Sequence, residues 1–190
     1  MIYLDQDGPL AKFMEALLRV HGREDVLADY PNGQWLMGHH LGITDTQLVD
    51  AVEAEGVKFW SDLEPQPWAE RLIALCEAHD DVEIATDANF GVWAASGKRI
   101  WLRDHFAGRY LATAHITSRK QRLAHKHAIL IDDSDKNVKA FIDAGGEAIL
   151  WPMPWNNGWL GCATADDKLA HVESALARIA ERKTWHTAKR

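Results

Sequence analysis

Three short apolar segments of this chain each end in polar or acidic residues, and this pattern restricts the fold more than any other feature. The three are residues 1–4, followed by Asp5-Gln6-Asp7-Gly8; residues 82–86, which end at Thr86; and residues 128–131, followed by Asp132-Asp133. Short apolar runs bounded by turn residues are typical of buried β-strands. We therefore expect three buried strands, each leading into a polar loop.

Segments with helical periodicity separate these strands. The predicted helices cover residues 9–22, 44–56, 68–79, 90–106, 138–145 and 165–181, and two further strands are predicted at 111–116 and 148–151. Thr44 and Gln47 match a capping box at the start of the second helix. Residues 23–43 show no regular pattern. Because strands and helices alternate, we expect an α/β, Rossmann-like parallel sheet with helices on both faces.

Composition excludes several classes of protein. The chain has 190 residues, which suits one compact domain with a small insertion. Its formal net charge of −7 argues against stable binding to nucleic acid or to a membrane surface, because both are polyanionic. No apolar run approaches the roughly 18 residues that span a bilayer. Cys76 and Cys162 form no CxxC motif, and an acid already stands at position 5, so we expect a cytoplasmic protein without a secretory segment.

The polar residues that follow the strands are expected to converge. Ligands of open α/β sheets bind beyond the carboxyl ends of the strands, which would bring Asp5, Asp7, Thr86 and the Asp132-Asp133 pair together. Carboxylates at such short range repel one another, and a hard cation such as Mg²⁺ neutralises them most simply. A single aspartate after a strand is also common in turns and at helix N-caps. The combination of two acidic pairs favours a functional site.

Four segments resemble the motifs of the haloacid dehalogenase-like (HAD) phosphatase superfamily. They are Ile2-Tyr3-Leu4-Asp5-Gln6-Asp7-Gly8 for the first motif, Thr86 at the end of 82–86 for the second, Lys120 for the third and Ile129-Leu130-Ile131-Asp132-Asp133 for the fourth. Two stretches resemble the 5′(3′)-deoxyribonucleotidase branch in particular. These are Asp-Gln-Asp-Gly-Pro-Leu-Ala-Lys-Phe at 5–13 and Phe-Trp-Ser-Asp-Leu-Glu-Pro-Gln-Pro-Trp-Ala at 59–69. The resemblance covers residues 1–151.

The resemblance implies a role for each acid of the first motif. Asp5 would be the nucleophile that attacks the phosphoryl group and forms an aspartyl-phosphate. Asp7 would protonate the leaving oxygen and then take a proton from the hydrolytic water. Mg²⁺ would be held by the Asp5 side chain, the Asp7 main-chain carbonyl and an acid of the fourth motif. Asp133 is favoured as that ligand, with Asp132 as its neighbour, although the sequence alone does not separate the two.

The remaining motifs would bind the phosphoryl group. Thr86 would donate a hydrogen bond to a phosphoryl oxygen, assisted by amides around Asp87, and Lys120 would neutralise the charge of the transferring group. Lys126 competes with Lys120 for this role, because the gap between Lys120 and Asp132 is longer than the family pattern suggests. We favour Lys120, since Lys126 directly precedes the strand.

An insertion between the first two motifs forms a cap in this superfamily. By this resemblance, residues 15–62 would form a small helical cap, and residues 1–14 and 63–190 the HAD-like core. Phe13, Trp35 and Trp60 could stack on a nucleobase. Core packing is the alternative for each of them, and Phe13 is the strongest candidate.

Two further stretches have competing interpretations. Gly91-Val92-Trp93-Ala94-Ala95-Ser96-Gly97-Lys98-Arg99 superficially resembles a phosphate-binding P-loop, but it has one residue too many between the glycines and lies within a helical pattern. The tryptophan-rich segment 151–159 could line the rim of the site or pack against the C-terminal helix, and we favour packing.

Together these features predict a Mg²⁺-dependent phosphomonoester hydrolase for nucleoside monophosphates, specifically deoxyribonucleotides. One alternative keeps the chemistry and changes the substrate to a sugar phosphate or a nucleic-acid 3′-phosphate. Another is a non-catalytic, receiver-like module that accepts a phosphoryl group on aspartate. The expected partner is a small phosphomonoester, with no stable nucleic-acid or membrane partner, and a homodimer is a further expectation.

Overall fold

The sheet consists of five parallel strands. The computed structural model describes residues 1–30, 33–35, 37–159 and 161–187. Its strands are β1 (Ile2–Leu4), β2 (Val82–Thr86), β3 (His115–Ile116), β4 (Ile129–Asp132) and β5 (Glu147–Leu150), in the order β3-β2-β1-β4-β5. Ile2 of the central strand pairs with Val82 on one side and with Ile129 on the other. The predicted parallel α/β sheet is confirmed.

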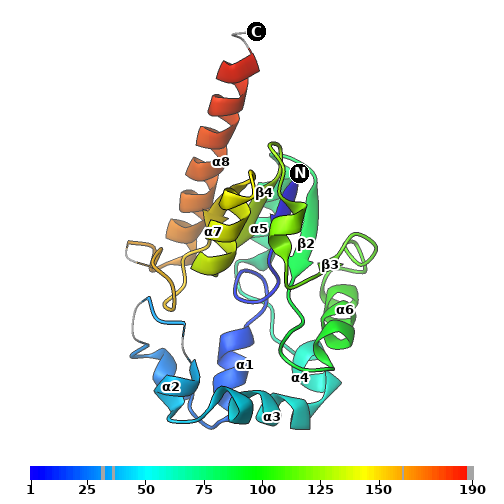
Figure 1. The fold of residues 1–190 in the computed structure, drawn as a ribbon, viewed down its shortest axis with the longest axis vertical. Coiled ribbons are helices and arrows are strands. Elements are labelled where there is room, and N and C mark those ends of the chain that lie inside the picture. The colour runs from blue at the N-terminus through cyan, green and yellow to red at the C-terminus, as the bar shows by residue number, and fades with distance from the viewer. Residues whose placement is uncertain (31–32, 36, 160, 188–190) are drawn as a thin grey trace.

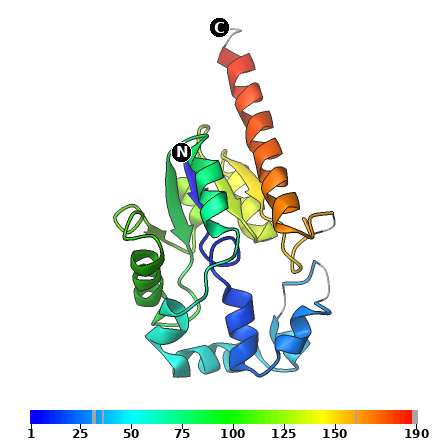
Figure 2. The same cartoon turned by 180° about the vertical axis from the view of Figure 1, so that it is seen from behind.

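Helices cover both faces of this sheet. They are α1 (Phe13–Val20), α2 (Met37–Leu41), α3 (Asp45–Glu55), α4 (Val57–Ser61), α5 (Ala69–Glu77), α6 (Ala94–His105), α7 (Asp135–Asp143) and α8 (Ala165–Thr187), with short 3₁₀ turns η1 (Glu24–Leu27) and η2 (Lys120–Leu123). Helix α7 and η2 lie on one face (Figure 1), and α5 and α8 lie on the opposite face (Figure 2). No helix within the described residues is long and apolar enough to cross a membrane.

Alternating side chains of β1 enter two separate parts of the core. Ile2 and Leu4 are fully buried in the larger apolar cluster, which also contains residues of α5 and α8. Tyr3 points to the other face and packs in a smaller cluster with Leu130 and Phe141. Because both faces are buried, the strand is apolar at every position, as expected for a parallel sheet covered on both sides.

The helices from α1 to α4 lie together beyond the carboxyl ends of the strands (Figure 1). Helix α4 packs closely against α6, where a Cβ on Gly97 would lie 2.3 Å from Cβ of Trp60. Helix α1 begins at Phe13, before the predicted cap boundary at residue 15. The division into a 15–62 cap and a core stays a prediction, but this segment does lie where it can cover the edge of the sheet.

Several local expectations are borne out and others are wrong. The Thr44–Gln47 capping box is present, and α3 ends at Glu55 with Gly56 as its C-cap residue. The segment 23–43 was expected to be irregular, yet it contains η1 and α2. Strand 111–116 is reduced to the two residues of β3, because residues 107–113 form consecutive turns. Helix α8 continues past the expected end at 181 to Thr187, and the first added residue, Arg182, is a strong helix former.

Candidate active site

The loop after β1 places Asp5 at the centre of the site. Asp5 is buried, and its backbone N–H donates to the carbonyl of Ile131 on β4, so β1 and β4 remain paired up to this residue. Gly8 has a φ of +83°, and a Cβ there would lie 2.0 Å from Oδ2 of Asp133. Only glycine lets this loop approach the end of β4, so the DxDG pattern has a direct steric reason.

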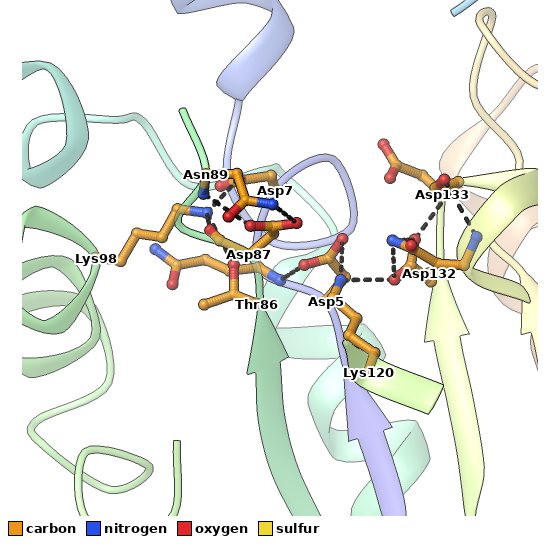
Figure 3. Close-up of polar contacts among 12 residues, drawn as sticks. Asp5, Asp7, Thr86, Asp87, Asn89, Lys98, Lys120, Asp132 and Asp133 are labelled. Atoms are coloured by element: carbon orange, nitrogen blue, oxygen red, sulfur yellow. Dashed lines mark hydrogen bonds and ion pairs between the residues drawn. The ribbon is translucent and has the colours of Figure 1, made fainter. Parts of the chain in front are cut away.

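Lys120 joins the first and fourth motifs. Its Nζ lies 2.7 Å from Oδ2 of Asp5 and 2.6 Å from Oδ2 of Asp132, and its side chain is 2% exposed (Figure 3). The backbone N–H of Ser134 donates to Oδ1 of Asp132, and the Asn137 amide donates to both oxygens. The competitor Lys126 is exposed. Of the two lysines considered, Lys120 is the one that lies beside the acids of the first and fourth motifs.

Three carboxylates could hold a metal ion at the ends of β1 and β4. One oxygen each from Asp5, Asp132 and Asp133 lies within 4.8 Å of the others. Both Asp132 oxygens accept hydrogen bonds, whereas Asp133 accepts one at Oδ2, from Nε1 of Trp155 at 2.8 Å. Within the described residues Oδ1 of Asp133 has no hydrogen-bond donor. Asp133 is therefore better suited than Asp132 to ligate a cation directly, and hard oxygen ligands suit Mg²⁺.

Burial dominates the electrostatics of these acids. Burial raises the pKa of Asp5 to about 7, with Lys120 opposing the rise and Asp132 adding to it. Burial and then the charge of Asp5 raise the pKa of Asp133 well above its usual range. Burial lowers the pKa of Lys120, but Asp132 and Asp5 outweigh that effect and raise it above its ordinary value. The carboxylates are thus destabilised as anions, and a divalent cation would relieve this.

The end of β2 forms the other half of the site. Thr86 is fully buried, and Asp87 follows it, with its carboxylate accepting from the backbone N–H of Asn89 at 2.7 Å. Asp7 is not among the three clustered carboxylates. Its side chain points toward the end of β2 and pairs with Lys98, whose Nζ lies 2.5 Å from Oδ2 of Asp7 (Figure 3). Lys98 also donates to Oγ1 of Thr86 at 2.9 Å.

A cavity of about 230 Å³ opens above these groups. Its polar floor contains Asp5, Asp7, Asp87, Lys98, Lys120 and Asp133. Phe13, Trp35 and Phe90 line it as an aromatic wall. Trp60 does not line it, because its ring lies behind Phe13, stacked at a centroid distance of 5.4 Å, and is fully buried. Of the three aromatic candidates, two reach the cavity and the third supports one of them.

Sequence reasoning missed Lys98 and Trp155. Lys98 lies on the buried face of α6 with Ala94, Trp101 and Leu102. A lysine at a core position of an amphipathic helix was an available signal, because lysine is almost never fully buried without a partner. Trp155 is buried, its ring packs against Tyr30 and Trp35, and its Nε1 donates to a candidate metal ligand. The favoured packing of segment 151–159 against the C-terminal helix is made by Trp151 and Trp159, whose rings lie near Lys168 of α8.

Solved structures with this fold come from several bacteria. A haloacid dehalogenase-like hydrolase from Xanthomonas campestris is 12% identical with a TM-score of 0.57, over 95% of this chain and 93% of that one. A protein from Bacillus subtilis assigned as a HAD-hydrolase and bound to magnesium is 14% identical with a TM-score of 0.56, over 92% and 97%. A HAD family hydrolase from Deinococcus radiodurans with bound phosphate and sodium is 19% identical with a TM-score of 0.54, over 94% and 95%. At these identities the likeness concerns the fold.

A protein family also matches this sequence. None of the curated proteins compared with the chain matches it. The family described as 5′ nucleotidase, deoxy (pyrimidine), cytosolic type C protein (NT5C) matches residues 1–179. This match contains all four motif segments and agrees with the resemblance found from the sequence. The chain therefore belongs to this 5′-nucleotidase family of the HAD superfamily and is a phosphatase of the nucleotidase type.

Proposed function

We propose that the protein is a Mg²⁺-dependent 5′-nucleotidase that hydrolyses nucleoside monophosphates, with deoxyribonucleotides as its preferred substrates. The observation that carries this proposal is the cavity itself. It combines the Asp5 carboxylate, two buried lysines and candidate metal ligands on its floor with an aromatic wall at its side. The floor suits a phosphoryl group, and the wall suits a nucleobase.

The chain's own residues supply a two-step reaction. An Asp5 oxygen attacks phosphorus, the bond between phosphorus and the leaving oxygen breaks, and Asp7 gives its proton to that oxygen. Water then attacks the phosphorus of the aspartyl-phosphate, Asp7 takes the water proton, and phosphate leaves as the Asp5 carboxylate is restored. Lys120 and Thr86 stabilise the charge on the phosphoryl oxygens.

Mg²⁺ would be held by the Asp5 side chain, the Asp7 main-chain carbonyl and Asp133. When bound, such an ion neutralises the carboxylates and withdraws charge from the phosphoryl oxygens. Two observations support a cation at this place. One oxygen each of Asp5, Asp132 and Asp133 lies within 4.8 Å of the others. Within the described residues, Oδ1 of Asp133 has no hydrogen-bond donor, whereas Oδ2 accepts from Trp155.

The aromatic wall favours a nucleotide over a sugar phosphate. Phe13 is held from three sides by Phe59, Phe90 and Trp60, so its ring has a fixed position at the cavity. Trp35 is 48% exposed and lines the same cavity, so a flat base can contact it. Such a rigid aromatic contact suits the flat π-face of a base, which a sugar phosphate lacks. A cytoplasmic location and a homodimer stay predictions from the sequence.

A phosphate-release screen tests the proposed substrate class. With Mg²⁺ present, we expect nucleoside monophosphates to be hydrolysed with a higher kcat/KM than sugar phosphates or 3′-phosphorylated oligonucleotides. Phe13→Ala should raise KM for the nucleotide by about tenfold, because one stacking contact contributes ~1–3 kcal/mol. The same substitution should leave kcat/KM for a sugar phosphate unchanged. A preference for sugar phosphates in the wild-type protein would contradict the nucleotide assignment.

The raised pKa of Asp5 predicts how Mg²⁺ binding depends on pH. Without a cation, the native state holds protons on Asp5 and Asp133 more tightly than the unfolded chain does. The free energy of unfolding therefore falls as pH rises from the pKa of an aspartate in the unfolded chain through about 7, the pKa of Asp5 in the native state. Mg²⁺ competes with these protons. We expect it to raise the thermal midpoint more at about pH 8 than at about pH 6. Equal shifts at both pH values, measured against EDTA blanks, would argue against Mg²⁺ binding at these acids.

A further inference from the structure

Lys98 is an ammonium group surrounded by oxygen acceptors from two motif loops. Its side chain is 1% exposed, and Nζ donates to Oδ2 of Asp7, to Oγ1 of Thr86 and to the carbonyl of Asp87. These three acceptors use all three N–H donors of the ammonium group. Lys98 therefore fixes the loop after β1 relative to the end of β2.

The packing of α6 leaves Lys98 little freedom. Gly97 brings the helix against α4, where a Cβ on that residue would lie 2.8 Å from the carbonyl of Val57. The ring of Trp60 then lies 4.9 Å from Nζ of Lys98 and closes one side of the lysine. Because Trp60 also stacks on Phe13, one packed group of side chains connects the aromatic wall to the Asp7 carboxylate.

The two oxygens of Asp7 differ in their environments. Oδ2 accepts from Lys98 at 2.5 Å, whereas Oδ1 is buried and has no hydrogen-bond partner within the part of the chain that the structure describes. A buried oxygen without a partner is costly unless a ligand or water satisfies it. Oδ1 is therefore the oxygen left for the leaving group and for the hydrolytic water.

Each acid of the Asp-x-Asp pair thus has its own lysine. Lys120 binds Asp5 and Asp132 in the half of the site that holds the candidate metal ligands, and Lys98 binds Asp7 in the other half (Figure 3). We propose that Lys98 is the positioning residue of the acid–base step: it holds Oδ2 of Asp7, so that Oδ1 gives and takes the proton. This inference rests on the proposed phosphatase mechanism and extends it to a residue outside the four motifs.

Lys98→Met tests this role because methionine keeps the length of the stem and removes the ammonium group. We expect kcat for a nucleoside 5′-monophosphate to fall by about 10²-fold or more, within the range for a lost acid–base contribution. With 4-nitrophenyl phosphate, whose leaving group departs without a proton, the first turnover should slow by less than about tenfold. Later turnovers should be slow, because the water-activating step also needs Asp7. Lys58→Met, an exposed lysine on α4, is the matched control and should behave as wild type.

A double-mutant cycle with Asp7→Asn completes the test. If Lys98 acts through Asp7, adding Lys98→Met to Asp7→Asn should change turnover by less than about threefold. The double variant removes both charges of the pair, so this comparison also holds where the single variant does not fold. Equal losses of the first-turnover rate for both substrates in Lys98→Met, or a further large loss in the double variant, would overturn the inference. A wild-type protein that hydrolyses no phosphomonoester would instead overturn the proposed function, and the role of Lys98 with it.

Discussion

Replacing Asp5 with asparagine is expected to abolish phosphate release and to leave the fold intact. An amide oxygen is a poor nucleophile, so no aspartyl-phosphate can form, and the loss should be at least about 10⁴-fold, as for other removed nucleophiles. Asparagine has the shape of aspartate, and its Oδ1 can still accept from the backbone N–H of Gln6. Phosphate release from a nucleoside monophosphate, with circular dichroism as the check on folding, measures both outcomes.

The stability of this variant separates a chemical loss from a structural one. Asp5 is buried beside other acids, and that burial raises its pKa, so its charge costs the folded protein free energy near neutral pH. We expect the thermal midpoint of Asp5→Asn without Mg²⁺ to equal or exceed that of wild type. Asp50→Asn, at an exposed position of α3, is the matched control and should keep full activity. Turnover of Asp5→Asn within about tenfold of wild type would rule out Asp5 as the nucleophile.

The convergence of Asp5, Asp132 and Asp133 could be predicted because it follows from the strands alone. Parallel neighbouring strands end at the same edge of a sheet, so residues that follow them must approach one another. The pairing of β1 with β4 fulfils this condition. The strands themselves were evident from short apolar runs, and α3 from its capping box, since both signals depend only on neighbouring residues.

Other features depend on contacts that no local pattern contains. Lys98 reaches Asp7 only because Gly97 lets α6 pack against α4, a contact between segments about 40 residues apart. Trp155 donates to Asp133 from a segment for which packing was favoured over a place at the rim of the site. Phe13 was the stronger candidate in sequence, and the structure places Trp60 stacked behind it, away from the cavity lining. In each case long-range packing, rather than residue type, assigned the role.

Removing the ammonium group at Lys120 is expected to cost both activity and stability. Its Nζ is the link between Asp5 and Asp132, and the whole side chain is buried. Lys120→Met leaves these carboxylates without their counter-charge, so we expect unfolding free energy to fall by about 3–5 kcal/mol, the range for breaking a buried ion pair. Turnover should fall by about 10³-fold, because the charge on the transferring phosphoryl group loses its lysine. Denaturant unfolding and phosphate release measure the two effects.

Lys126→Met is the matched control, because Lys126 is exposed and lies in the turn that leads into β4. It should keep wild-type stability and turnover, and a larger loss there than in Lys120→Met would show that the third motif had been assigned to the wrong lysine. Mg²⁺ then distinguishes lost charge from lost structure. Because the carboxylates of Lys120→Met have lost their ammonium partner, Mg²⁺ should raise the thermal midpoint of this variant more than that of wild type. A variant that no longer responds to Mg²⁺ would mean that Lys120 holds the metal-binding acids in place rather than balancing their charge.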